Sequence, residues 1–198
     1  MGSESVGVNP IELIGPWDEG YALDIHTVSS TYIGDNVYGH PEFITEYSEM
    51  GQLLHLFKYK NKQSILSDII KLAKPFIESW SAIREVSFVL PVPSSKIRIY
   101  QPAQEIASEI ASFIHVGYSD EILQKVSSIE SKDLSPNDKQ QVYGSIIKTA
   151  KATQEHNMLL VDDLYKSGAT LVECVRVLRE DPKINKIFVL TMTKTRKV

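Results

Sequence analysis

The chain has 198 residues, of which 42% are hydrophobic and 23% charged, and this composition predicts a single globular domain spanning residues 1–198. Its formal net charge is −4, whereas nucleic-acid-binding domains are usually basic, so we do not expect direct binding to DNA or RNA. Cys174 is the only cysteine, which excludes an intramolecular disulfide and a cysteine zinc site, and we expect it to fill space in the core.

Aromatic residues and glycines are frequent in residues 10–45. Residues 21–27 alternate between apolar and polar side chains, as a half-buried strand does. Turn signals lie on both sides, at Gly15-Pro16 and at residues 34–36. We therefore expect residues 10–45 to form a β-hairpin or small meander that is too small to stand alone and packs on the main domain as an N-terminal appendage.

Two segments with helical spacing follow. Residues 48–60 place their large apolar side chains on one helical face. A second helix can begin at Ser64, and its apolar positions continue to Trp80. Pro75 lies inside this pattern and predicts a kink or a split there.

A short strand and a polar loop come next. Residues 86–90 are apolar enough for a strand, and a loop rich in proline, serine and basic residues follows them. A helix with regular apolar spacing over residues 103–114 ends the unit. Such a loop before a helix is a candidate anion site. Its candidate ligands are Pro93, Ser94, Ser95, Lys96 and Arg98.

After a short predicted strand over residues 122–126, the sequence shows neither helical nor strand periodicity up to about residue 141. Loops as long as this one are usually functional or disordered in a compact domain. Residues 127–139 hold too few large apolar side chains to offset the entropy of fixing the backbone, so we expect this segment to be mobile without ligand. Lys125, Lys132 and Lys139, which lie within residues 121–141, are candidate contacts to an anionic ligand, and a merely solvated linker is the alternative.

The most informative stretch is MLLVDDLYKSGAT at residues 158–170. Four apolar residues predict a buried strand, and Asp162 and Asp163 follow directly. A polar loop then leads into a helix whose apolar residues lie at 171, 174, 175 and 178. A loop between a strand's carboxyl end and a helix N-terminus exposes N–H groups that suit a phosphate. The candidate phosphate ligands are Lys166, Ser167, Gly168, Ala169 and Thr170.

The acidic pair complements this phosphate site. Asp162 and Asp163 could accept hydrogen bonds from two vicinal hydroxyls or hold Mg²⁺ through water. A phosphate site and a diol site a few ångströms apart fit a ribose 5-phosphate. A last buried strand is predicted over residues 187–192. The alternation of strands and helices predicts an α/β fold, with a mainly parallel twisted sheet and helices on both faces.

Residues 158–170 resemble the phosphoribosyl-pyrophosphate (PRPP) signature of type I phosphoribosyltransferases. The pieces LFKYKN, VLPVP and QEIA, then the signature, then VLT occur in an order similar to that of ComF-like phosphoribosyltransferases. ComF-like proteins often begin with a four-cysteine zinc element. This chain has an aromatic hairpin in its place. Lys166 stands where purine-salvage members carry an aspartate, which argues against salvage of 6-oxopurines.

The resemblance implies a transferase in nucleotide metabolism that uses PRPP and Mg²⁺ and displaces pyrophosphate with a small-molecule acceptor. Asp162 and Asp163 would hold the ribose and Mg²⁺, residues 166–170 the 5-phosphate, and residues 93–98 the pyrophosphate. The segment at 127–139 would close over PRPP as a lid, and the N-terminal hairpin would be a hood over the acceptor. No protein zinc site is implied.

Several points stay open. The alternatives to turnover are a non-catalytic PRPP or nucleotide-binding regulator, and a competence- or defence-associated accessory protein that works through partners. Basic residues in the pyrophosphate loop favour turnover. No stretch reaches membrane-spanning length and the N-terminus lacks a signal pattern, so we expect a cytoplasmic protein without a membrane partner. A homodimer is a possible partner state, and the sequence does not specify the acceptor or the general base.

Overall fold

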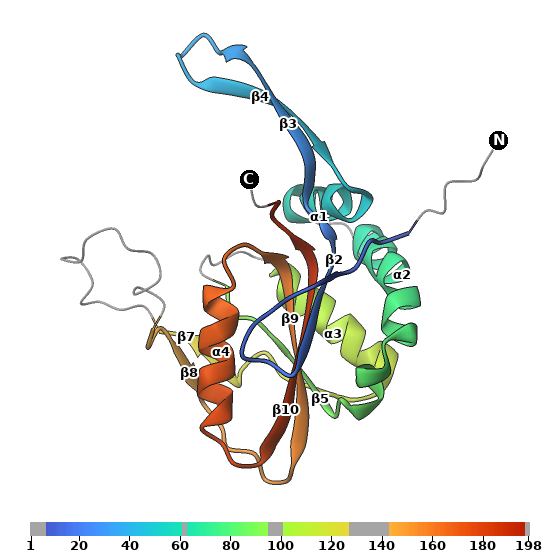
Figure 1. Cartoon of the computed structure of the whole chain (residues 1–198), viewed down its shortest axis with the longest axis vertical. Coiled ribbons are helices and arrows are strands. Elements are labelled where there is room, and N and C mark those ends of the chain that lie inside the picture. The colour runs from blue at the N-terminus through green and yellow to red at the C-terminus, as the bar shows by residue number, and fades with distance from the viewer. Residues whose placement is uncertain (1–6, 61–62, 95–100, 127–142, 197–198) are drawn as a thin grey trace.

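A computed structural model describes residues 7–60, 63–94, 101–126 and 143–196 of the chain. Its body is a mainly parallel sheet with helices on both faces, which confirms the predicted fold class (Figure 1). The sheet has six strands in the order β1-β2-β10-β9-β5-β6. Only β1 runs antiparallel to its neighbour, β2. The strands are β1 (Ile11–Glu12), β2 (Glu19–Ile25), β5 (Phe88–Pro91), β6 (Gly117–Tyr118), β9 (His156–Tyr165) and β10 (Ile184–Lys194).

The helices divide between the two faces of this sheet, and each group closes a separate apolar core. Alternate residues of β9 point to opposite faces, as the period of a strand requires. Leu159 and Val161 pack with the helices α1–α3, whereas Met158 and Leu160 pack with α4. The helices are α1 (Glu49–Lys60), α2 (Gln63–Ser79), α3 (Pro102–Ile114) and α4 (Ala169–Arg179), with a short 3₁₀ turn at Ser81–Glu85.

Local sequence accounts for where α3 begins and ends and for where α4 begins. Pro102 occupies the first turn of α3, where its missing N–H has no partner to lose, and the helix stops at His115, which has a left-handed φ of 58°. Gly168, with φ of 75°, precedes α4. Cys174, on the inner face of α4, is fully buried in the core, as predicted.

Two antiparallel hairpins lie outside the central sheet. One pairs β7 (Leu123–Lys125) with β8 (Ile146–Lys148) beside α4. The other pairs β3 (Thr27–Asp35) with β4 (Pro41–Tyr47) and projects away from the body (Figure 1). We call the second hairpin, residues 27–47, the arm.

Three local expectations differ from the structure. The predicted strand at residues 21–27 lies mainly in β2, inside the central sheet, so only the arm stands out from residues 10–45. Pro75 does not split the second helix, because α2 runs unbroken from Gln63 to Ser79. The strand predicted over residues 158–161 extends through Asp162 and Asp163 to Tyr165, because β10 pairs with it along this whole length.

Across the described parts of the chain, no helix combines the length and the apolar character needed to cross a membrane.

Candidate functional site

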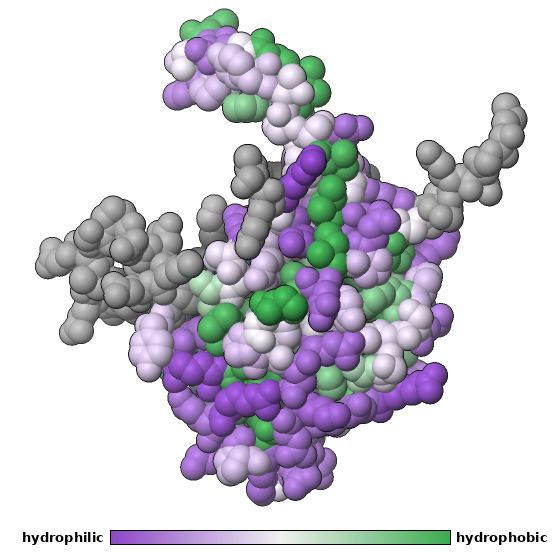
Figure 2. Space-filling view, viewed as in Figure 1, coloured by the Kyte–Doolittle hydropathy of each residue, from purple (hydrophilic) through white to green (hydrophobic). Residues whose placement is uncertain are grey.

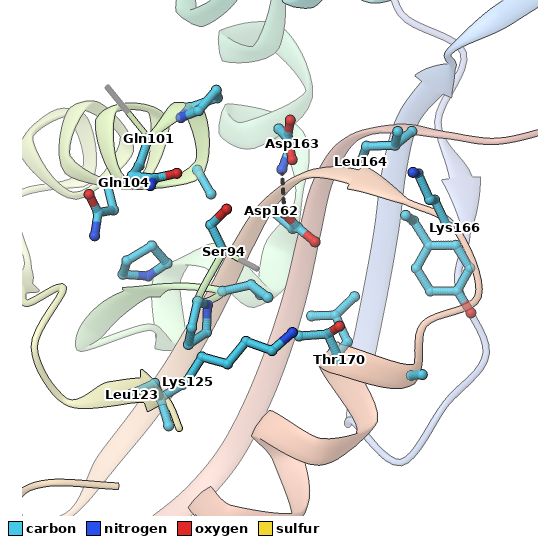
Figure 3. A pocket seen from close by; sticks show the side chains of 18 of the residues that line it. Ser94, Gln101, Gln104, Leu123, Lys125, Asp162, Asp163, Leu164, Lys166 and Thr170 are labelled. Carbon is cyan, nitrogen blue, oxygen red and sulfur yellow. Dashed lines mark hydrogen bonds between the residues drawn. The ribbon is translucent and has the colours of Figure 1, made fainter. Parts of the chain in front are cut away.

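A cavity of about 630 Å³ opens at the carboxyl ends of β5 and β9 (Figure 3). Five regions far apart in sequence supply its walls: the end of α1, the loop after β5, the start of α3, the β7 strand, and the stretch from β9 into α4. Its polar lining residues are Lys58, Ser94, Gln101, Gln104, Asp120, Gln124, Lys125, Asp162, Asp163, Tyr165, Lys166, Ser167 and Thr170.

The two aspartates leave β9 on opposite sides of the strand (Figure 3). Asp163 follows the alternation of Val161 and faces the α1–α3 side, whereas Asp162 follows Leu160 and faces α4. The Asp163 backbone N–H donates to Asp162 Oδ1 at 2.8 Å, which fixes the Asp162 carboxyl against the strand. The two carboxyl groups therefore lie at different walls of the cavity.

Lys58, near the end of α1, forms an ion pair with Asp163 Oδ2. Both side chains are 18% exposed, so solvent screens this pair only in part. Burial acts to raise the pKa of Asp163, but the charge and hydrogen bond of Lys58 outweigh it and the pKa is lowered. Burial, and next the charge of Asp163, raise the pKa of Asp162 well above its usual range. The aspartate pair thus favours a single negative charge, which Lys58 balances.

The loop after β9 is shaped by Gly168. Its φ of 75° lies in the left-handed region, and an added Cβ would stand 2.6 Å from the Tyr165 hydroxyl. Helix α4 begins with the Val172 N–H donating to the Gly168 carbonyl at 2.9 Å. The first N–H groups of a helix have no carbonyl of their own helix to bind, so this turn offers donors to the cavity that it lines.

Lys125 faces this loop from the other side. Its side chain extends from β7 across the cavity toward Thr170 (Figure 3). A cation opposite a helix N-terminus provides a second contact for an anion bound between them. The exposed Lys166 and Ser167 lie at the rim, where the loop leaves β9.

Most of the predicted site residues that the structure describes meet in this one cavity. Pro93 and Ser94 line it together with Asp162, Asp163, Lys125 and residues 166–170. Ser95, Lys96, Arg98, Lys132 and Lys139, like most of the segment 127–139, lie outside the described residues. Among the described residues that line the cavity, none comes from the arm, so the expected hood is not seen over it.

Lys58, Gln101 and Gln104 are lining residues that the sequence did not identify. Lys58 follows the buried Phe57 and lies one turn after the buried Leu54. A lysine at the border of a buried helical face is a signal that it points toward another element. What it meets there depends on how α1 packs on the sheet, which local patterns do not reveal.

The aspartate pair fits a particular kind of Mg²⁺ site. Within the described ranges, no three carboxylate, histidine or cysteine side chains gather where they could hold a metal by themselves. Mg²⁺ in proteins is often bound by one or two carboxylates together with substrate phosphates and water. The pair suits a metal that arrives with a phosphorylated ligand rather than one held by a protein cage.

The chain is thus an α/β protein with a cavity lined by polar residues at the carboxyl ends of β5 and β9. No family model matches its sequence, and no curated protein matches it. Among solved structures, the fold is similar to adenine phosphoribosyltransferase from Saccharomyces cerevisiae, crystallised with an imino-altritol bisphosphate and adenine. The two chains are 12% identical, with a TM-score of 0.46 over 83% of this chain and 84% of that one.

Two further structures show similar likenesses. Adenine phosphoribosyltransferase from Trypanosoma brucei, in complex with AMP, pyrophosphate and ribose-5-phosphate, is 10% identical, with a TM-score of 0.48 over 93% of this chain and 74% of that one. Phosphoribosylpyrophosphate synthetase from Mycobacterium smegmatis is 12% identical, with a TM-score of 0.41 over 83% and 73%. At these identities the likeness concerns the fold alone.

Proposed function

We propose that this protein is a phosphoribosyltransferase of the ComF-like kind, which uses PRPP and Mg²⁺ and transfers ribose 5-phosphate to an acceptor with release of pyrophosphate. One observation carries the proposal: a single cavity joins an acidic pair to a glycine loop at a helix N-terminus, in the order strand, Asp-Asp, loop, helix. This order puts hydroxyl acceptors and phosphate donors at neighbouring places, as a ribose 5-phosphate requires.

The loop before α4 is assigned to the 5-phosphate. The backbone of residues 167–170 and the Thr170 hydroxyl supply donors, and the helix dipole favours the negative charge. Lys125 supports this assignment, because it brings an ammonium group to the opposite wall. Lys166, at the rim, adds a further positive charge to the approach.

The acidic pair is assigned to the ribose hydroxyls and to Mg²⁺. Asp163, whose pKa is lowered by its pairing with Lys58, accepts hydrogen bonds as a carboxylate, and Asp162, whose pKa is raised by burial, adds a second carboxyl group beside it. Mg²⁺, when bound with the substrate, neutralises charge on the leaving pyrophosphate. Lys58 lies beside Asp163 and is available to the same phosphates once the ligand competes for its ammonium group.

The transfer breaks the bond from C1 to the pyrophosphate oxygen and forms a bond from C1 to the acceptor. Its transition state resembles an oxocarbenium ion, so the positioning of the substrates and the stabilisation of charge contribute most of the rate enhancement. Pro93 and Ser94 are assigned to the pyrophosphate side of the cavity. Ser95, Lys96 and Arg98 keep their predicted roles there.

The test is PRPP-dependent release of pyrophosphate, assayed over a panel of nucleobases and without any base. We expect release with at least one acceptor, and we expect the Asp162→Asn/Asp163→Asn variant to lose it. Glu78→Gln is the matched control, because Glu78 is an exposed carboxylate on α2. PRPP binding in calorimetry without any turnover would favour the regulator instead, and absence of PRPP binding would refute both.

A further inference from the structure

The arm exposes an unusual amount of apolar surface. None of its residues, from 27 to 47, is buried. Val37 and Tyr38 at its tip are 93% and 82% exposed. Figure 2 shows hydrophobic residues along this projecting hairpin. The other large apolar side chains exposed on the arm are Val28, Tyr32, Ile33, Phe43 and Ile44.

The arm is well formed but has no core of its own. The Asn36 side chain accepts hydrogen bonds from the Tyr38 and His40 backbone N–H groups at 2.9 and 3.0 Å, which closes the turn. The Tyr32 and Phe43 rings meet across the strands, with centroids 5.6 Å apart. A two-stranded hairpin is at best marginally stable in water when nothing covers it. A further surface that packs on the arm would supply the missing stabilisation.

The two free edges of the arm differ in chemistry. The β4 edge carries Pro41, Glu42 and Glu46, and proline and charge are the devices that protect an edge strand from pairing. The β3 edge has neither from Thr27 to Gly34. Its β-branched and aromatic residues favour an extended strand. Its register with β4 shifts at Val28 and at Ile33, and between these two bulges residues 29–32 form a regular, unprotected template for another strand.

We propose that β3 pairs antiparallel with β3 of a second copy of this chain, around a two-fold axis near Thr31. The result is a four-stranded sheet in the order β4-β3-β3-β4. Such an isologous contact satisfies the free backbone groups of both copies at once. The charges select this edge, because self-pairing of β4 about Ile44 would set Glu42 opposite Glu46, and like charges directly opposite are destabilising.

The structure also limits where this pairing begins. The Arg196 guanidinium donates to the Val28 carbonyl at 2.9 Å, so the base of the β3 edge is already occupied. The segment left for a second copy is residues 29–32, between the two register shifts of β3, and it holds only uncharged side chains. The contact lies on the arm, away from the cavity, and does not depend on what the cavity binds.

Sedimentation equilibrium of the full chain tests this proposal. Contacts of this small size belong to the weak class, so protein concentrations on the order of 100 µM are needed. We expect a mass of twice 22.3 kDa for the native protein. We expect a monomer for Thr31→Lys and for Thr31→Glu, because each sets like charges together at the axis. An equimolar mixture of these two variants should restore the dimer, because lysine then faces glutamate.

Ile44→Lys is the matched control. Ile44 pairs with Thr31 on the same face of the arm, but it lies on β4, one strand further from the axis. The variant carries the same new charge and should remain dimeric. A native monomer, an Ile44→Lys protein that is as monomeric as Thr31→Lys, or a mixture that stays monomeric would each overturn the pairing through β3.

Discussion

Replacement of Gly168 by alanine tests how tightly the loop before α4 is built. The φ of 75° lies in the left-handed region, and the new Cβ would lie 2.6 Å from the Tyr165 hydroxyl and 2.8 Å from its ring. The left-handed conformation costs a residue with a Cβ about 1–2 kcal/mol. Crowding against a packed side chain costs about 1–3 kcal/mol.

We therefore expect Gly168→Ala to lower the free energy of unfolding by about 2–5 kcal/mol. For a domain of this length, that loss lowers Tm by roughly 4–20 °C. The protein should still fold, because domains are typically stable by about 5–15 kcal/mol. Because the loop must shift, its affinity for AMP or inorganic phosphate should fall roughly tenfold or more. Circular dichroism and titration calorimetry measure the two effects.

A double-mutant cycle with Tyr165→Ala separates the two causes. Without the tyrosine ring the crowding disappears, and only the conformational cost of about 1–2 kcal/mol should remain. An equal loss of stability in both backgrounds would show that Tyr165 does not crowd residue 168. An unchanged Tm for Gly168→Ala in the native background would refute the left-handed conformation as well.

Further expectations concern the aspartate pair and Cys174. Asp162→Asn should raise Tm at pH 8 and leave it unchanged in acid. The pKa of Asp162 is raised in the folded protein, so the Asp162 side chain favours folding in acid and this stabilisation is lost as the pH rises through the folded pKa. Asp163→Asn should lower Tm at neutral pH by leaving Lys58 unpaired, and the loss should vanish in acid, because a lowered pKa stabilises only above the unfolded value. Lys58→Met should cost about 1–3 kcal/mol, and combining it with Asp163→Asn should cost less than the sum of the two, as thermal melts will show. The buried Cys174, whose pKa is raised by burial, should react with a thiol reagent only as fast as the protein unfolds, and rapid labelling of the folded protein would contradict its placement.

The sequence could predict elements whose patterns are local. The helical spacing over residues 103–114 matches α3, and the run at 158–161 matches the centre of β9, because apolar periodicity and burial are the same signal there. The loop at 166–170 was placed at a helix N-terminus for the same reason. These elements position residues 162–170 in the cavity, which explains why the sequence could bring this part of the candidate site together.

Features that depend on distant parts of the chain could not be predicted. Residues 21–27 alternate as a strand does, but the parallel neighbour of β2 is the distant β10, and no local pattern predicts that pairing. Lys58 reaches Asp163 only because α1 packs across the sheet. Whether a hairpin folds back or projects is likewise set by tertiary contacts, so the arm was expected to pack on the domain but projects instead.

The placement of β10 has a consequence for how this protein is made. The strand β10 lies in the interior of the sheet, between β2 and β9. Its Val189 lies opposite Gly20 of β2 on one side and opposite Leu160 of β9 on the other. Until the C-terminal strand has left the ribosome, the N-terminal strand pair and the β9-β5-β6 half have no common neighbour. Pairing between such distant segments is slow and leaves apolar edges exposed meanwhile. A nascent chain that stops short of residue 184 would therefore hold two half-sheets that cannot join.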